Sequence, residues 1–582
     1  MLKVFLQSVA SQAVARSKVE NPEVLESLAT LFLQAYPEAM LSKYSEEELV
    51  ERILKAYQVS RLRKEGEIKI DSVHMDGYTL IFIDNDDQPF LLDTLKLQME
   101  EMDVPYDLYV HPIITVERNE KGELVRVAPS WEEGPKESLI LFETRLDPSR
   151  VEGVKDRLLT ILRVAKDVVG DFVKMKRRLR DAINDLDFYR ELRGDPQGEL
   201  EEIGAFLEWL YDRHFVFLGS LYLEDGGGEE GGLGICRPQH RGVPDLFSID
   251  GLKERLSKEP RVFRYTKGRE TAQLYRRSKL DVMAVRSFSE DGEPKGWHLF
   301  FGLFTKRALT EKAEGIPILR LKLQRILQSM RVVVGSYDYK RVVMLYDLLP
   351  LDDLLISPES EIEELISAIL YMGREDVVKV FQRLREEYLA LMVVFSQEKY
   401  SAKLEEEIED RLEQLVQGAY IETRLFIYED SLVFLWFFLY KDGLALLDEE
   451  ALEEEISELS LSWEDRFKNF LSSSYPPEDA AVLYHRYGGL FPEEYKAITP
   501  PEEAVVDLLY LEQLRETGEI QVSFHQEEDY TRIKFFSLEE LTLSATVPVL
   551  ENMDLEVLDE VSIHLEKGRE TFCIHSFRVV TS

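Results

Sequence analysis

Cysteine is nearly absent from this chain, which has Cys236 and Cys573 as its only two among 582 residues. Two cysteines cannot build a disulfide framework, and on their own they cannot complete a structural zinc site, which takes four ligands. The sequence therefore excludes a small secreted disulfide scaffold, and we expect no metal site.

Positive charge is also scarce. Lysine and arginine number 71 against 111 aspartates and glutamates, so the formal net charge is −40. Nucleic acids and anionic membranes repel a chain of this charge unless it carries a local basic patch. We therefore expect no nucleic-acid partner and no membrane partner.

Long apolar runs are missing. The longest is LVFLWFFLY at 432–440, which is too short for a membrane helix of about 20 residues and suits a buried strand. The first residues, MLKVFLQSVASQAVARSK, lack the continuous apolar segment of a signal peptide. These features predict a cytoplasmic protein of several domains, since about 150 residues per domain is typical.

Catalytic signatures are lacking as well. The nine histidines are scattered without an HExxH pattern, and there is no GxSxG elbow. The glycines of 226–234 do not follow GxGxxG, and Glu229 and Glu230 would repel a phosphate. We interpret that segment as a flexible hairpin excursion, and we predict no catalytic residue and no cofactor-binding residue in this chain.

The chain does contain an internal repeat. MEEMDV at 99–104 returns as LENMDL at 550–555, and each copy is followed by an extended apolar segment and a Lys-Gly turn, at 120–123 and 566–569. A shared order of helix end, strand, turn and strand indicates a reused supersecondary unit. Reused modules of this kind favour binding and regulation over chemistry.

Hydrophobic periodicity predicts a multidomain α+β fold. Helical spacing of apolar residues predicts helices in 21–58, 149–169, 174–192, 316–390 and 446–516. Alternating or continuous apolar stretches predict strands between them, and Ser289–Gly292 is a hairpin signal. The predicted strands are 78–83, 106–117, 138–145, 214–223, 281–288, 297–305, 388–395, 419–428, 431–440, 520–524, 531–536 and 571–580.

A dense basic cluster stands out in this acidic chain, with Phe263, Tyr265 and Tyr275 interleaved. Pairing with acidic residues of the chain or of a partner, a small anion, and single-stranded nucleic acid are the three interpretations, and the overall charge favours pairing. The cluster, a predicted anion or interface patch, comprises Arg261, Arg264, Lys267, Arg269, Arg276 and Arg277, followed by Lys279 and Arg286.

Several longer motifs resemble the amino-terminal, non-catalytic region of the large bacterial NAD-specific glutamate dehydrogenases. The resemblance covers essentially the whole chain in order, and its strength lies in the order and spacing of the motifs. The motifs are DDQPFLLDTL (86–95), YVHPI (109–113), FVFLG (215–219), GLGICR (232–237), YTK (265–267), LDVMAVRSFSEDGEPKGWHLFFGLFT (280–305), IPILRLKLQRIL (316–327), FPEEYKAITPPEEAVVDLLYLEQL (491–514) and VPVLENMDLEVLDE (547–560).

The resemblance implies ACT-like (ferredoxin-like) units and a PAS-like unit joined by helical connectors. The implied domains are an N-terminal helical segment (1–66), ACT-like domain 1 (67–172), a helical connector (173–198), a PAS-like α+β domain (199–312), a helical segment (313–386), ACT-like domain 2 (387–445), a helical motif (446–516) and ACT-like domain 3 (517–582). The family's Rossmann domain and NAD site have no counterpart in the sequence. The resemblance therefore implies a regulatory subunit, or a fragment of a longer enzyme, that assembles with a catalytic glutamate dehydrogenase domain or subunit and forms a homo-oligomer. A free-standing amino-acid sensor acting on another partner is the alternative, and an enzyme with an unrecognised site is the least favoured.

The loop before the helix at 91 is the expected effector site. In ACT domains that bind amino acids a glycine usually follows the proline here, whereas Phe90 follows Pro89 and takes up that room. Free backbone N–H groups at the helix start suit an amino-acid carboxylate, and the aspartates could hold its ammonium group. The other interpretations are a helix cap, which is the simpler one, and a cation loop. The predicted effector-binding residues are Asp84, Asp86, Asp87, Gln88 and Phe90.

Overall fold

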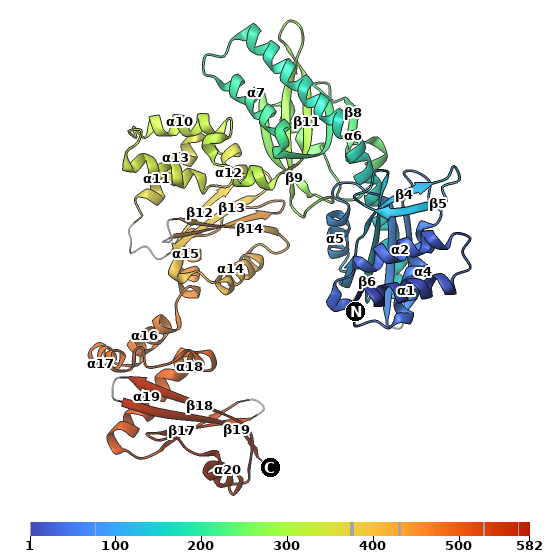
Figure 1. The fold of residues 1–582 in the computed structure, drawn as a ribbon. Coiled ribbons are helices and arrows are strands. Elements are labelled where there is room, and N and C mark those ends of the chain that lie inside the picture. The colour runs from blue at the N-terminus through green and yellow to red at the C-terminus, as the bar shows by residue number, and fades with distance from the viewer. Residues whose placement is uncertain are drawn as a thin grey trace. The chain divides into compact units, whose positions relative to one another are not determined.

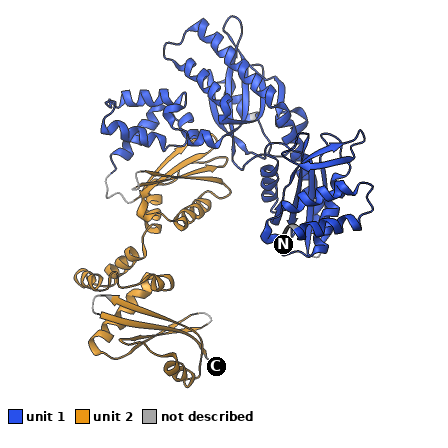
Figure 2. Cartoon of the chain, in the orientation of Figure 1, with its two compact units in different colours: residues 1–372 blue, residues 373–582 orange. Residues whose placement is uncertain are grey.

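The computed structural model describes residues 2–75, 77–372, 378–428, 432–527, 530–567 and 570–581. The chain divides into two compact units, residues 1–372 and 373–582 (Figure 2), which are treated separately below. Figure 1 labels their helices and strands. Among the described residues, no helix combines the length and apolar character needed to span a bilayer.

Helices begin the first unit. α4 starts at a capping box in which Ser45 and Glu48 satisfy each other's backbone N–H groups. The apolar sides of the four N-terminal helices pack on one face of the first sheet, against Leu80, Phe82, Leu139 and Leu141. The helices are α1 (Leu2–Arg16), α2 (Pro22–Gln34), α3 (Glu38–Leu41) and α4 (Glu46–Ser60).

The first sheet has the order β1-β2-β6-β4-β5, with β3 also paired to β6. β3 and β4 follow one another along β6 and are separated by Pro112, which cannot donate a ladder hydrogen bond. α5 (Leu91–Glu101) and α6 cover the face opposite α1–α4. The strands are β1 (Lys69–Met75), β2 (Tyr78–Asp86), β3 (Tyr106–Val110), β4 (Ile113–Arg118), β5 (Leu124–Pro129) and β6 (Lys136–Thr144).

α6 (Val151–Arg193) is one helix of 43 residues. The two separate helices predicted at 149–169 and 174–192 are thus continuous, because nothing between them breaks the helix. α6 packs first against α5 and β1 and then against α7, β7, β8 and β10 of the next sheet.

The second sheet is antiparallel with the order β8-β7-β11-β10-β9. β8 takes up much of the glycine-rich segment and pairs antiparallel with β7, so the predicted hairpin is confirmed, although the segment forms a regular strand and not a flexible excursion. A Cβ on Gly234 would lie 2.2 Å from the carbonyl oxygen of Leu218, so this strand approaches β7 too closely for a side chain. The elements are α7 (Glu199–Trp209), β7 (Phe215–Glu224), β8 (Glu229–Gly234), α8 (Asp250–Ser257), β9 (Phe263–Thr271), β10 (Lys279–Phe288) and β11 (Pro294–Phe304).

Helices complete the first unit, in agreement with the helical periodicity of this stretch, but the prediction of helix as far as residue 390 is wrong because 378–384 forms strand β12. They are α9 (Lys306–Thr310), α10 (Leu319–Ser329), α11 (Tyr337–Asp347), α12 (Leu351–Ile356) and α13 (Glu359–Leu370).

The second unit contains two further antiparallel sheets, β12-β13-β15-β14 and β16-β17-β19-β18. The predicted turns at Glu429-Asp430 and Gly568-Arg569 lie outside the described residues. The elements are β12 (Val378–Leu384), β13 (Leu389–Ser396), α14 (Ala402–Leu415), β14 (Tyr420–Tyr428), β15 (Leu432–Tyr440), α15 (Glu449–Leu459), α16 (Trp463–Ser474), α17 (Pro477–Tyr487), α18 (Glu493–Ile498), α19 (Pro501–Thr517), β16 (Gln521–Gln526), β17 (Thr531–Ser537), α20 (Leu543–Glu551), β18 (Leu555–Lys567) and β19 (Glu570–Thr581).

Three of the four sheets, together with their helices, share one plan. We call the units of β1–β6, β12–β15 and β16–β19 the first, second and third repeats. Each is two strands, a helix and two strands, and the fourth strand lies between the second and the third. In the first repeat β3 and β4 together take the place of the third strand, and β5 is an addition. The repeated hexapeptide ends the helix in the same way, because Asp103 and Asp554 both have a left-handed backbone, with φ of 51° and 58°. The predicted α+β multidomain fold is confirmed.

Candidate functional site

The expected effector loop runs from the end of β2 to the start of α5. Side chains alternate along a strand, so Asp84 and Asp86 share the face of Phe82, toward α1–α4. Asp84 is fully buried and lies near two guanidinium groups, with its carboxylate 3.7 Å from Arg63 Nε and 3.5 Å from Arg118 Nη2.

Glu137 on β6 completes this buried ion cluster. Arg118 Nη2 lies 2.6 Å from its carboxylate, Arg63 pairs with it as well, and Arg63 also binds Asp86 at 2.7 Å. Burial and the charge of Glu137 raise the pKa of Asp84 to about 7, although the two arginines lower it. Burial therefore favours the protonated form of Asp84 at a higher pH than for an exposed aspartate.

The other predicted residues lie at the start of α5. The Ser138 hydroxyl donates to Asp87 Oδ1 at 2.8 Å, and the backbone N–H of Asp87 donates to the Lys136 carbonyl. The N-cap of α5 is Phe90, without a side-chain cap hydrogen bond. The predicted aspartate cap is therefore wrong.

Two buried amides near this loop have unused hydrogen-bonding capacity. Asn85, which sequence reasoning missed, is 1% exposed, and within the described chain neither its oxygen nor its nitrogen has a hydrogen-bond partner. The side-chain nitrogen of Gln88 is in the same state. A buried amide without a partner is costly, so a ligand or a water at this position would be held by it. A polar residue at the end of an apolar strand was the available signal for Asn85.

Phe90 occupies the position where a glycine is usual, and its backbone adopts the left-handed conformation that glycine favours, with φ 67°. Its ring packs edge to face on Tyr275, with ring centroids 5.0 Å apart. Tyr275 also has a positive φ, and its backbone N–H donates to Thr94 Oγ1 at 3.2 Å. The segment 272–278, which joins β9 to β10, thus covers the first turns of α5.

A buried hydrogen-bond network fixes this segment on the helix. The Gln98 side-chain amide donates to both the backbone carbonyl and the side-chain oxygen of Gln273, each at 3.1 Å. Arg157 on α6 donates to the side-chain oxygens of both glutamines at 2.8 Å. α5, α6 and the second sheet are joined at this point, directly behind the effector loop.

The basic cluster is divided among separate ion pairs. Arg261 and Arg264 both bind Glu259, and Arg277 binds Glu101 at 3.0 Å. Burial raises the pKa of Glu259, but the hydrogen bonds from the two arginines outweigh the effect of burial and lower this pKa to about 2. For these residues the structure shows pairing with the chain's own acids, which is the favoured prediction.

Lys267 and Arg276 are held inside the fold. Lys267 is buried between Asp281 and Asp352, at 2.6 and 2.7 Å, and so links β9 to α12. Arg276 Nη2 donates to the carbonyl oxygen of Phe304 at 2.8 Å. Both cations serve the packing of the first unit.

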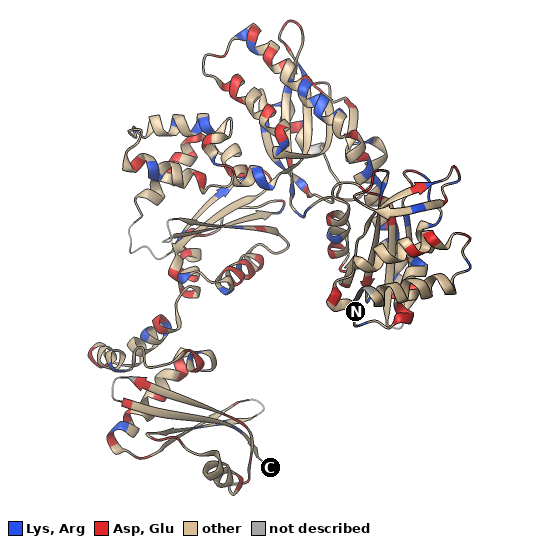
Figure 3. Cartoon of the chain, in the orientation of Figure 1, with Lys and Arg blue, Asp and Glu red and all other residues tan. Residues whose placement is uncertain are grey.

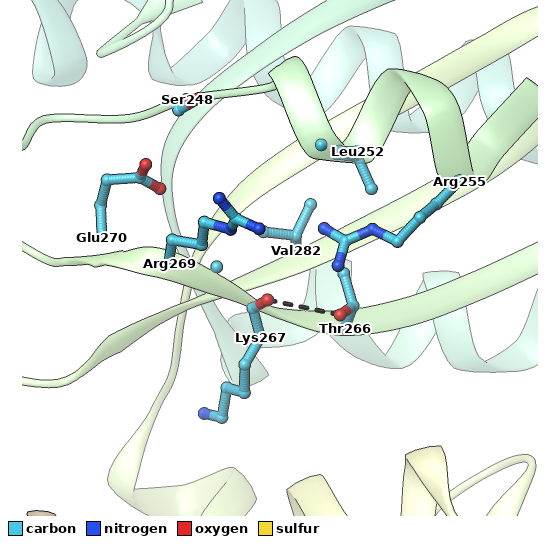
Figure 4. A pocket seen from close by; sticks show the side chains of 10 residues that line it. Ser248, Leu252, Arg255, Thr266, Lys267, Arg269, Glu270 and Val282 are labelled. Atoms are coloured by element: carbon cyan, nitrogen blue, oxygen red, sulfur yellow. Dashed lines mark hydrogen bonds between the residues drawn. The ribbon is translucent and has the colours of Figure 1, made fainter. Parts of the chain in front are cut away.

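A small cavity lies between α8 and β9 (Figure 4). The guanidinium groups of Arg255 and Arg269 lie beside it, above Thr266, whose hydroxyl donates to the Lys267 carbonyl at 3.3 Å. Its volume of about 20 Å³ is close to the room of a single water molecule. Of the predicted patch, Lys267 and Arg269 line this cavity, and Arg255 of α8 was missed by sequence reasoning.

No group of three or more histidine, cysteine, aspartate or glutamate side chains within the described ranges is arranged to hold a metal ion.

Comparison with known proteins fits the repeated architecture. Five models of glutamate dehydrogenase domains match the chain in order: the ACT1 domain at 28–158, helical motif 1 at 316–375, the ACT2 domain at 380–464, helical motif 2 at 471–514 and the ACT3 domain at 519–582. The ACT1, ACT2 and ACT3 matches contain the first, second and third repeats.

Curated relatives agree. The chain is 25% identical over 531 residues to an NAD-specific glutamate dehydrogenase of Halomonas elongata, covering 86% of this chain and 33% of the relative. It is 26% identical over 527 residues to that of Pseudomonas aeruginosa, covering 86% and 32%. For the Mycobacterium tuberculosis enzyme the identity is 20% over 504 residues, covering 81% and 30%. The chain spans about a third of the length of the curated relatives it matches.

The three repeats define a protein built from ACT-type α+β domains. The chain matches the ACT-domain and helical-motif models of glutamate dehydrogenase, and over most of its length it is similar to NAD-specific glutamate dehydrogenases.

Proposed function

We propose that this chain is a regulatory and assembly portion of an NAD-specific glutamate dehydrogenase of the cytoplasm. The reaction it serves is L-glutamate + NAD⁺ + H₂O → 2-oxoglutarate + NH₄⁺ + NADH + H⁺. The observation that carries the proposal is the ordered match of three ACT models to three sheets of one plan, with two helical-motif models matching the helices between them. The NAD site and the chemistry belong to a catalytic domain or subunit with which this chain associates, and the second sheet is its PAS-like domain.

The first repeat is the proposed effector-binding domain. The effector is an amino acid held at the loop 84–90 and the start of α5. The unpartnered buried amide of Asn85 supports this assignment, since it can hydrogen-bond a ligand without losing an existing partner. The contact of Phe90 with Tyr275 gives the loop a direct connection to the second sheet, through which occupancy would alter the first unit.

The test of the main proposal is glutamate oxidation. The catalytic chain is assayed for glutamate-dependent NADH formation with and without this chain, at increasing concentrations of single amino acids. We expect this chain to change the rate and to make it respond to at least one amino acid. An unchanged rate and unchanged assembly, or turnover by this chain alone that a point mutation within it abolishes, would overturn the proposal.

The effector site has its own test. Calorimetric titration of the chain with a panel of amino acids is compared for the native protein, Asn85→Ala and Asp87→Ala. Asn469→Ala, an exposed asparagine on α16, is the matched control. Loss of binding in Asn85→Ala with retention in the control supports the site. Binding that both loop variants leave unchanged places the effector elsewhere, and the patch from Arg261 to Arg277 is then the next position to test.

A further inference from the structure

The helices of the first and third repeats differ on one side. Aligned through the repeated hexapeptide, Leu91, Thr94, Gln98 and Met102 correspond to Thr542, Ala545, Val549 and Met553. These positions form one stripe along each helix, because they are three or four residues apart. We call the second set the α20 flank.

The two stripes have opposite environments. In the first repeat, Leu91, Thr94 and Gln98 are buried and Met102 is half-buried, and Thr94 and Gln98 bind the segment 272–278. In the third repeat all four residues are exposed, Val549 at 55% and Met553 at 60%. The inner side of α20 is packed normally, with Leu550 and Val547 against Phe577 and Ile533. The exposed flank is therefore a feature of an ordered helix.

Solvent-facing sides of the repeat helices need not be apolar. α14 of the second repeat exposes Glu406, Asp410 and Glu413, the usual pattern for a helix with one side in water. By contrast, residues 542–550 carry no charge at all, in a chain whose net charge is −40. Figure 3 shows acidic residues along α14 and none along this part of α20. Uncharged apolar surface on an otherwise charged protein marks an interaction site.

We propose that the α20 flank binds the same flank of a second copy of this chain, with the two helices antiparallel about a two-fold axis. Side-chain size along the flank supports this occupant. It rises from Ala545 to Val549 and Met553, so an antiparallel pair sets the small residue of each helix opposite a larger residue of the other. A two-fold axis makes such a contact self-complementary. Because residues 542–550 carry no charge, the centre of the contact also avoids the like-charge opposition that two copies of this acidic chain meet elsewhere.

The contact is small. One helix flank buries far less than the roughly 1,200 Å² of a standard stable interface, so we expect a reversible dimer of micromolar strength or weaker. In a larger assembly such a contact adds to others, because a second contact between chains already joined is effectively intramolecular. The inference rests on the assembly role proposed above. Its test needs neither glutamate nor NAD, so its failure is distinguishable from failure of the proposed function.

The test is analytical ultracentrifugation of the whole chain across a wide concentration range. We expect concentration-dependent dimers, and at least a tenfold weaker association in Val549→Glu and in Ala545→Lys, each of which sets like charges near the axis. Val506→Glu is the matched control, since Val506 is a 49% exposed valine on α19, and it leaves association unchanged. Circular dichroism checks that each variant is folded.

Mixing the two variants identifies the partner. In the mixed pair, the glutamate introduced at position 549 of one copy faces the lysine introduced at position 545 of the other. The remaining Ala545–Val549 contact is native, so association returns. A strictly monomeric native chain would overturn the proposal. Association that neither variant weakens would do the same, as would a mixture that associates no better than each variant alone.

Discussion

The first and third repeats share one topology and differ in what their neighbours supply. The first repeat contains a buried ion cluster, formed by Arg63, Arg118, Asp84 and Glu137. Its helix α5 is covered by the segment 272–278. In the third repeat the buried sheet cation is a single lysine, Lys534, paired with Asp507 and Glu503 of α19, while the pair Arg578–Asp559 is solvent-exposed and the helix flank is bare. The alternation of apolar side chains is sufficient for the shared plan, whereas the polar interior of the first repeat depends on the helices and loops packed around it.

The largest expected effect is the difference in unfolding free energy lost when an arginine of the buried cluster or of the exposed pair is removed. Arg63→Ala removes one of the two guanidinium groups that face Glu137 and Asp84, which costs up to about 3–5 kcal/mol of unfolding free energy, since Arg118 still faces both carboxylates. Arg578→Ala removes an exposed pair and changes stability little. Chemical denaturation, with hydrogen exchange of β2 and β6 to localise the loss, measures both. Equal shifts in the two variants would contradict the comparison.

The pH dependence of the first repeat follows from Asp84. Its pKa is about 7 in the folded chain and about 4 when unfolded. Between these values the folded state binds a proton that the unfolded state lacks, so stability falls as pH rises from about 4 to about 7. The upper bound of the effect is about 4 kcal/mol.

Asp84→Asn removes this component, which shows as a difference in unfolding free energy between variant and native chain that grows toward pH 7. Asp559→Asn is the control. The hydrogen bond from Arg578 lowers the pKa of Asp559, so its contribution is lost as pH falls. The same slope in both variants would count against the assignment.

Exchanging the matched helix residues is the next test. Gln98→Val removes hydrogen bonds to Gln273 and leaves buried polar groups unpaired, which costs about 1–3 kcal/mol. Val549→Gln, the reciprocal change, affects an exposed side chain and leaves the stability of the third repeat nearly unchanged. Denaturation of each variant measures the asymmetry, and equal costs would contradict the difference in environment between the two stripes.

The smallest expected effect concerns thiol reactivity. Burial raises the pKa of Cys236 well above its ordinary value, and burial together with Glu540 raises that of Cys573. The thiolate is the reactive form, so both should resist a disulfide reagent at pH 8, with Cys236 the slower. Both react once the chain is unfolded. Fast labelling of the native protein, assigned with Cys236→Ser, would show that these sites open.

Much of the fold could be predicted because the signals are local. The hairpin at Ser289–Gly292 forms as expected, and the hexapeptide repeat is a real structural repeat. β1 and β12 were missed because KIDSVHM and VKVFQRL alternate weakly and lie at sheet edges. Both gain their strand conformation from pairing with β2 and β13, partners that periodicity cannot reveal.

The site was harder to predict because its determinants are distant in sequence. Asp84 lies beside the guanidinium groups of Arg63 and Arg118, and Phe90 is covered by Tyr275 from the segment between β9 and β10. Sequence spacing indicated that the 84–90 loop was unusual. It could not indicate that the aspartates face inward, that the cap is absent or that Asn85 lacks a partner.

The unbroken length of α6 has a consequence for how this chain can vary. The helix is about 65 Å long, and Asp171 near its middle binds Arg237 at 2.6 Å and the backbone N–H of Gly234 at 3.0 Å. Inserting one residue upstream of Asp171 would rotate everything after it by about 100° relative to the first sheet. The orientation of the second sheet relative to the first is thus fixed by the helical phase of α6, against which both sheets pack. Substitutions along α6 are tolerable one at a time, whereas insertions and deletions between residues 151 and 193 are not, and natural length differences should be found in the loops on either side.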